Sequence, residues 1–195
     1  MALPALLILA GALAAVEYQS HRRTVQGRRY RTPEGEAKLA LRPSQWMPGH
    51  VSVTPQPGAI MACHVFGVVE HTGIWLGEGA IAELHGSGLV RAVSLERFLA
   101  KRSGNTLFCL CDHRHQPLAD PDVAERAAQA LFTYRDYHLT DNNCHRFVWH
   151  CLSGDEQRIA SFGALNRLLA DHYRTHLYWD PVCAVQAGVG ASPRA

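Results

Sequence analysis

Five short apolar runs between residues 59 and 111 constrain the fold of this chain more than any other feature. Each has the length of a β-strand, and turn-forming tripeptides such as Gly77-Glu78-Gly79 and Gly86-Ser87-Gly88 separate them. Short runs joined by tight turns are typical of an antiparallel meander. The sequence therefore predicts a meander with strands at residues 59–65, 72–76, 81–84, 89–93 and 106–111.

The residues that follow have the spacing of helices. Asp120-Pro121 supplies an N-cap and a first-turn proline, and apolar residues recur from Val123 to Tyr134, so we expect a helix of about four turns there. Further helices are predicted from residue 143 or 144 to 152, ended by Ser153-Gly154, and from 161 to 176. Strands followed by helices indicate an α+β fold in which an antiparallel sheet packs on helices.

The N-terminal segment, residues 2–16, is apolar and uncharged. It is shorter than the roughly 20 residues of an ideal membrane span, and it also suits the apolar core of a signal peptide. No charged side chain precedes it, whereas five arginines follow between residues 22 and 31. Because positive flanks stay in the cytoplasm, we expect an N-terminal membrane helix that anchors a cytoplasmic domain to the cell membrane in a single pass. A cleaved signal on an exported protein is the alternative.

Composition divides the chain into four parts. Residues 1–17 are the membrane anchor or signal segment, and residues 18–57, which have little periodicity, are expected to be a juxtamembrane linker. Residues 58–180 contain the strands and helices and are predicted to form the folded domain. Residues 181–195 are expected to be a flexible tail, with no order beyond Trp179.

Charge and cysteine content exclude several classes of protein. The formal net charge is only +2 and the basic residues form no stripe, so nucleic acid is not an expected partner. The chain is larger than disulfide-dependent scaffolds, so its six cysteines are expected to be mostly free thiols. Zinc at Cys109-Leu-Cys111-Asp-His113-Arg-His115 is disfavoured, because side chains at i and i+2 of a strand project in parallel about 6.6 Å apart. No metal or other cofactor is expected.

Cys144 and His71 have the placement that catalysis requires. Cys144 begins a predicted helix, where the helix dipole and unpaired N–H groups stabilise a thiolate and can also stabilise an oxyanion. His71 lies on a predicted strand and suits the role of base. An odd-membered loop at residues 77–79 would place Glu83 and His85 on the face of His71, whereas a two-residue turn would place them opposite. Either side chain could then orient the imidazole, which gives a Cys-His-Glu or a Cys-His-His triad.

Two motifs give the chain a resemblance to a known family. His71-Thr-Gly-Ile-Trp-Leu-Gly and Asn143-Cys144-His-Arg-Phe-Val are similar to the H-x-G-I-[YW]-h-G and N-C-E-H-F-V motifs of the lecithin:retinol acyltransferase-like family, over residues 57–152. This family is related to the NlpC-type peptidases. The resemblance implies a circularly permuted papain-like fold, with histidine before cysteine, in which Cys144 is the nucleophile and His71 its base.

The chain departs from the family pattern at two places. Lipid-acting members have a second histidine where this chain has Glu83, with His85 two residues later. Relatives of bacterial type read E-L-x-G-x-G here, as does Glu83-Leu-His-Gly-Ser-Gly88, which favours Glu83 as third triad member with His85 as the alternative. His145-Arg146 replaces the usual Glu-His after the cysteine.

The resemblance implies a membrane-anchored thiol acyltransferase or hydrolase that forms an acyl-cysteine intermediate on lipid esters. One alternative is an NlpC-type amidase or peptidase that acts on peptide or cell-wall amides, which requires the domain to face outward. The other is a degenerate, membrane-tethered binding module without catalysis. The expected partners are therefore a lipid or another acyl or amide substrate, and the membrane.

Overall fold

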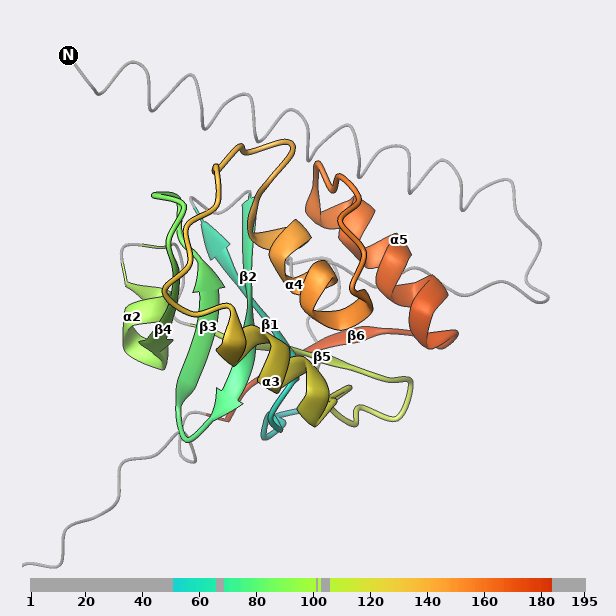
Figure 1. The fold of residues 1–195 in the computed structure, drawn as a ribbon. Coiled ribbons are helices and arrows are strands. Elements are labelled where there is room, and N and C mark those ends of the chain that lie inside the picture. The colour runs from blue at the N-terminus through green and yellow to red at the C-terminus, as the bar shows by residue number, and fades with distance from the viewer. Residues whose placement is uncertain (1–50, 66–68, 101, 103–105, 184–195) are drawn as a thin grey trace, which may run out of the picture.

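Six strands form one antiparallel sheet in the part of the chain that the computed structural model describes, which is residues 51–65, 69–100, 102 and 106–183 (Figure 1). Their order across the sheet is β4-β3-β2-β1-β5-β6. The strands are β1 (Ile60–Val65), β2 (Val69–Gly77), β3 (Ala80–Leu84), β4 (Val90–Ser94), β5 (Phe108–Cys111) and β6 (Tyr178–Pro181). Together with the helices packed on it, this sheet confirms the predicted α+β class.

The fifth strand pairs differently from the predicted meander. All five predicted strands are present, but β5 pairs with β1 instead of β4. A short helix that the sequence did not predict, α2 (Leu95–Leu99), follows β4 directly, with Ser94 as its N-cap and Phe98 fully buried. Because α2 packs against β3 and β4, the chain leaves the sheet after β4 and returns beside β1.

Strand β6 corrects the prediction for the C-terminal part of the chain. It pairs with β5, and beyond it the Val182 N–H donates to Leu107 O and the Cys183 N–H donates to Val53 O. Trp179 and Asp180 are both buried. The expectation of no order beyond Trp179 is therefore wrong for residues 180–183, because a four-residue strand is too short to show an alternating pattern. Residues 184–195 lie outside the described residues.

Three helices cover one face of the sheet: α3 (Pro121–Gln129), α4 (Cys144–Ser153) and α5 (Phe162–Tyr173) (Figure 1). Between them and the strands lies the larger core, in which Ile60 and Ile74 meet Phe147. A smaller core on the opposite face contains Trp75 and Phe98 of α2. The second and third predicted helices are thus confirmed.

Helix α3 is shorter than the sequence predicts. It ends at Gln129, and Phe132 adopts a left-handed φ of 64°. The following residues run beside β4 instead: the Phe132 N–H donates to Val90 O, and the Val90 N–H donates to Thr133 O. The helical spacing continued to Tyr134, but that side chain is 75% exposed and contributes nothing to a helix core.

The β2–β3 hairpin decides which side chains share a face with His71. Glu78 and Gly79 form the turn, both with positive φ, and a bulge adds one residue between Trp75 and Gly77. Trp75 therefore pairs with Ile81. The extra residue has the effect of an odd-membered loop, so Glu83 and His85 lie on the face of His71.

The segment expected to be a membrane helix, residues 1–17, lies outside the described residues, as do residues 18–50 of the expected linker. Within the described part of the chain, no helix is both long enough and apolar enough to cross a membrane.

Candidate active site

Asn143 fixes the start of helix α4. Its Oδ1 accepts hydrogen bonds from the N–H groups of His145 and Arg146, at 3.0 and 3.1 Å, which makes it the N-cap. Its Nδ2 donates to Leu139 O at 2.7 Å and to Ile159 O at 2.8 Å. Every hydrogen-bonding position of this amide is used, so Cys144 is held rigidly as the first residue of the helix.

His71 and Glu83 form a buried pair across β2 and β3. His71 Nε2 lies 2.7 Å from Glu83 Oε2, and the Glu83 side chain is fully buried. This bond leaves Nδ1 of His71 as the ring nitrogen available to the Cys144 thiol, with which His71 also interacts. The structure thus brings together three of the four residues singled out by the sequence.

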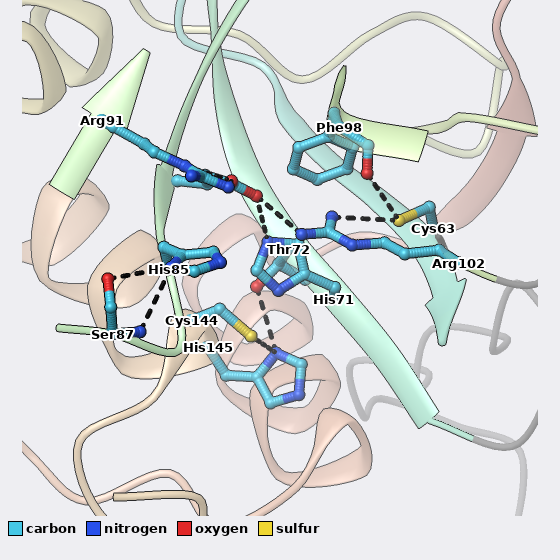
Figure 2. Close-up of polar contacts among 11 residues, drawn as sticks. Cys63, His71, Thr72, His85, Ser87, Arg91, Phe98, Arg102, Cys144 and His145 are labelled. Atoms are coloured by element: carbon cyan, nitrogen blue, oxygen red, sulfur yellow. Dashed lines mark hydrogen bonds and ion pairs between the residues drawn. The ribbon is translucent and has the colours of Figure 1, made fainter. Parts of the chain in front are cut away.

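Two arginines hold the Glu83 carboxylate. Arg91 donates from Nε and Nη2 to Oε1, at 2.9 and 2.7 Å, while Arg102 donates from Nη2 to Oε2 at 2.8 Å (Figure 2). A buried carboxylate is stable as an anion only when its oxygens are paired in this way. Arg91 and Arg102 therefore fix both the charge and the orientation of the group that contacts His71.

The protonation states of these groups follow from their neighbours. Burial raises the pKa of the Cys144 thiol, but the charges of His145 and His71 outweigh it and the pKa falls well below its usual range. Burial lowers the pKa of His71, yet Cys144 and Glu83 outweigh it and the pKa is raised. For Glu83, hydrogen bonds and charge from His71 and Arg102 overcome burial and lower the pKa. These opposite shifts favour a thiolate–imidazolium pair.

His145 places a second imidazole beside the nucleophile. Its Nδ1 lies 3.8 Å from Cys144 Sγ and 3.1 Å from Thr72 Oγ1 (Figure 2). The sequence showed the replacement of the usual glutamate at this position but gave His145 no role. In the structure it adds a polarisable, titratable group next to the thiol.

His85 lines the same cavity as His71, but its hydrogen bonds are to Ser87. Its Nδ1 is 2.9 Å from Ser87 Oγ and 3.2 Å from the Ser87 nitrogen. Of the two candidates for orienting His71, Glu83 makes the contact and His85 makes its contacts with Ser87.

Gly73 of the first motif allows the strands and α2 to approach each other. A Cβ at this position would lie 2.7 Å from Ala82 O and 3.0 Å from Phe98 Cε2. The Phe98 ring in turn lies against the His71 imidazole, with ring centroids 5.1 Å apart. A side chain at Gly73 would therefore displace the ring that packs on the candidate base.

A cavity of about 270 Å³ opens onto the thiol. Small-molecule sites typically have volumes of about 300–1,000 Å³, so this one is near the lower limit. Cys144, His71 and His85 lie on its wall with Tyr137 and Arg102. Other parts of the wall are apolar and come from Val65, Val69, Leu139 and Ala160.

The residues that were disfavoured as zinc ligands lie in β5 and in the loop that follows it. Cys109 and Cys111 are buried in β5, while His113 contacts Thr175 and His115 contacts Asp180. No group of three or more His, Cys, Asp or Glu side chains in the described ranges is arranged to hold a metal ion.

The region that contains both motifs also matches a known family model. The model described as Lecithin retinol acyltransferase matches residues 53–157, more than half of the chain. The chain belongs to this family. The predicted membership is thereby confirmed, and since the lecithin retinol acyltransferase family consists of cysteine-based acyltransferases, the chain falls in that general class of enzyme. A search of curated proteins gives no match.

Within this family domain, the two arginines that bind Glu83 were not predicted from the sequence. Arg91 had a signal, because the Gly86-Ser87-Gly88 turn pairs it directly with Glu83 across β3 and β4. Arg102 follows α2, at a position that no strand or helix pattern marks. Its contact with Glu83 arises only from the tertiary fold.

Proposed function

We propose that this chain is a thiol acyltransferase or hydrolase that forms an acyl-cysteine intermediate on Cys144, with a lipid ester as acyl donor. The observation that supports it most is the position of Cys144, at the N-terminus of α4 and beside His71, whose ring Glu83 orients. Cys144, His71 and Glu83 are the proposed catalytic triad.

In the first half of the reaction, Cys144 attacks the donor. The thiol proton is already on His71 Nδ1, and the thiolate sulfur bonds to the ester carbonyl carbon, whose C=O electron pair moves onto oxygen. When the C=O bond re-forms, the C–O bond to the alcohol breaks, and His71 gives its proton to the leaving oxygen. The products are the free alcohol and an acyl thioester on Cys144.

In the second half, an acceptor removes the acyl group. Water or an amine gives a proton to His71 as it attacks the thioester carbonyl, and the C–S bond then breaks, which restores the Cys144 thiolate beside the protonated His71. Glu83, anchored by Arg91 and Arg102, keeps the His71 ring in one orientation through both halves.

A lipid donor is consistent with the apolar part of the cavity wall and with the apolar N-terminal segment of the chain. The apolar wall formed by Val65, Val69, Leu139 and Ala160 can contact an acyl chain. We further propose that residues 1–17 anchor the protein in the cell membrane with the domain on the cytoplasmic side, which would keep it next to its substrates.

We also propose that the domain has the circularly permuted papain-like architecture. The candidate base lies on a strand, β2, that precedes the helix of the nucleophile, α4, in the chain. The contact between β2 and α4 brings the two together in space.

The experiment that tests this function is intact-mass spectrometry of the full chain in detergent after treatment with para-nitrophenyl octanoate. One acyl adduct that Cys144→Ala abolishes supports the proposal. Cys151→Ala is the matched control, because Cys151 is a buried thiol on the same helix, and its adduct should form as in the wild type. An adduct that persists in Cys144→Ala contradicts the proposal, and no adduct in the wild type favours the binding module.

A further inference from the structure

The attack of Cys144 on an ester places negative charge on the former carbonyl oxygen, and that charge needs hydrogen-bond donors. The N-terminus of α4 supplies fewer of them than its position suggests. Asn143 Oδ1 takes the N–H groups of His145 and Arg146, and Asn143 O takes that of Phe147. Among the described residues, the Cys144 N–H has no acceptor, so it is the first-turn donor that remains for substrate.

His85 has a defined tautomer, which follows from its contact with Ser87. The Ser87 backbone N–H points to His85 Nδ1 at 3.2 Å and can only donate. Nδ1 must therefore be an acceptor without a proton, and in the neutral ring the proton is on Nε2. Burial and the nearby charge of Arg91 lower the pKa of His85, which is consistent with a neutral ring.

The ring of His85 lies on the wall of the same cavity as Cys144 and His71. Figure 2 shows it projecting from beyond the end of β3 toward His71 and Cys144, with Ser87 on its other side. Since Ser87 occupies Nδ1, the edge of the ring that is left for a ligand is the one with Nε2–H.

Other side chains with hydrogen-bond donors also lie on the cavity wall, among them Arg102, Tyr137, His145 and Ser161. His145 already contacts Thr72 Oγ1 and Cys144 Sγ through Nδ1. The Arg102 guanidinium is already paired with Glu83 through Nη2 and contacts Cys63 Sγ through Nη1. The Tyr137 hydroxyl is one competing candidate, and a Tyr137→Phe variant distinguishes it from His85.

We propose that the Cys144 N–H and the His85 Nε2–H together form the oxyanion hole of this enzyme. This inference rests on the proposed acyl transfer at Cys144. His85, which the sequence offered as a partner of His71, would instead bind the substrate oxygen. As the C–S bond forms and the C=O pair moves onto oxygen, both donors shorten their hydrogen bonds to it, and no proton is transferred from either.

The test compares two reactions of the same thiol in the full chain. Acylation by para-nitrophenyl octanoate creates an oxyanion, whereas alkylation by iodoacetamide occurs at a saturated carbon and creates none. We expect His85→Ala to lower the acylation rate about 100-fold and to leave the alkylation rate unchanged. His85→Gln should restore most of the acylation rate, because the glutamine amide can place an N–H near the position of Nε2.

His113→Ala is the control, since His113 is an exposed histidine outside the cavity and its loss should change neither rate. Equal loss of acylation and alkylation in His85→Ala would overturn the inference, because His85 would then act on the thiol. Acylation at the wild-type rate in His85→Ala, or a loss seen in Tyr137→Phe instead, would overturn it as well. Failure of the wild type to form an adduct would reject the proposed function itself, which separates the two proposals.

Discussion

Two places in this molecule combine a cysteine, a histidine and a buried carboxylate. At β2 and β3, Cys144 accompanies His71 and Glu83, which are 2.7 Å apart. At β5 and β6, Cys111 accompanies His115 and Asp180, which are 2.9 Å apart. Both carboxylates are fully buried, so composition and burial do not distinguish the two groups.

The surroundings of the two groups distinguish them. Cys144 begins a helix and faces a cavity, and its pKa is lowered, whereas Cys111 lies inside a strand, where its contact with Cys109, burial and the charge of Asp180 raise its pKa. Glu83 is paired with two arginines, while no arginine in the described part of the chain pairs with Asp180. A helix N-terminus, a neighbouring imidazole and an adjoining cavity therefore distinguish the candidate catalytic group from the group at Cys111.

The largest expected difference between the two groups follows from neutralising each carboxylate. Glu83→Gln removes the anion that orients His71, so we expect the acylation rate to fall about 1,000-fold. Asp180→Asn should leave that rate unchanged. The release of para-nitrophenolate in the first turnover measures both. Equal rates in the two variants would show that Glu83 has no special role.

Glu83→Gln also tests the electrostatics through stability. Because the folded-state pKa of Glu83 is lowered, its contribution to the free energy of unfolding is fully present above its ordinary pKa of 4.5. The contribution is lost as the pH falls toward the folded-state pKa. The difference in unfolding free energy between wild type and variant, from urea titrations, should therefore shrink below pH 4.5 and not above it.

The second prediction compares the thiols directly. At pH 7 a thiol with a pKa of about 11, such as Cys63, is only about one part in 10,000 thiolate. Burial likewise raises the pKa of Cys151 to about 12. We expect iodoacetamide to alkylate Cys144 at least about 100-fold faster than Cys63, Cys111 or Cys151 in the native protein. Peptide mapping by mass spectrometry during the reaction measures this, and alkylation of Cys111 at the rate of Cys144 would remove the distinction.

Local sequence patterns predicted some of the features on which these predictions depend and not others. The strands up to β5, the start of α4 and the placement of Glu83 on the face of His71 follow from local patterns of apolar residues, turns and caps. The pairing of β5 with β1, the existence of β6 and the contact of Arg102 with Glu83 depend on long-range packing, which a local pattern does not contain. Likewise, α3 looked longer because Tyr134 continues its spacing, although that side chain faces solvent.

A further prediction concerns His145. It lies beside Cys144, and the group at Cys111 has no corresponding second histidine in the part of the chain that the structure describes. His145→Gln keeps a polar side chain near Thr72 but cannot become positive, so it should raise the pKa of Cys144. We expect alkylation at pH 6 to slow about tenfold and to approach the wild-type rate at high pH. His138→Gln, at an exposed histidine, is the control. An unchanged pH profile would mean that His71 alone activates the thiol.

The smallest expected effect is on stability, and it concerns the group formed by Cys111, His115 and Asp180. Asp180→Asn keeps an oxygen that can accept a hydrogen bond from His115, so the free energy of unfolding should fall by only about 1 kcal/mol. Urea unfolding measures this change. A loss of several kcal/mol would show that the charge of Asp180, and not its hydrogen bond, stabilises the β5–β6 edge.

Asn143 has a consequence for how the specificity of this domain can change. Its side chain ties the first turn of α4 to the carbonyl groups of Leu139 and Ile159, which belong to two separate loops. Leu139 and Ala160, the residue after Ile159, form part of the cavity wall. A substitution that shifts either loop to admit a different acyl chain therefore also pulls on the nucleophile. A change in the size of acyl chain that the cavity admits would thus also affect the catalytic rate, because the Asn143 amide holds both loops and the nucleophile. Asn143 does not hold Val65 or Val69, so new specificities should arise more readily at those two residues.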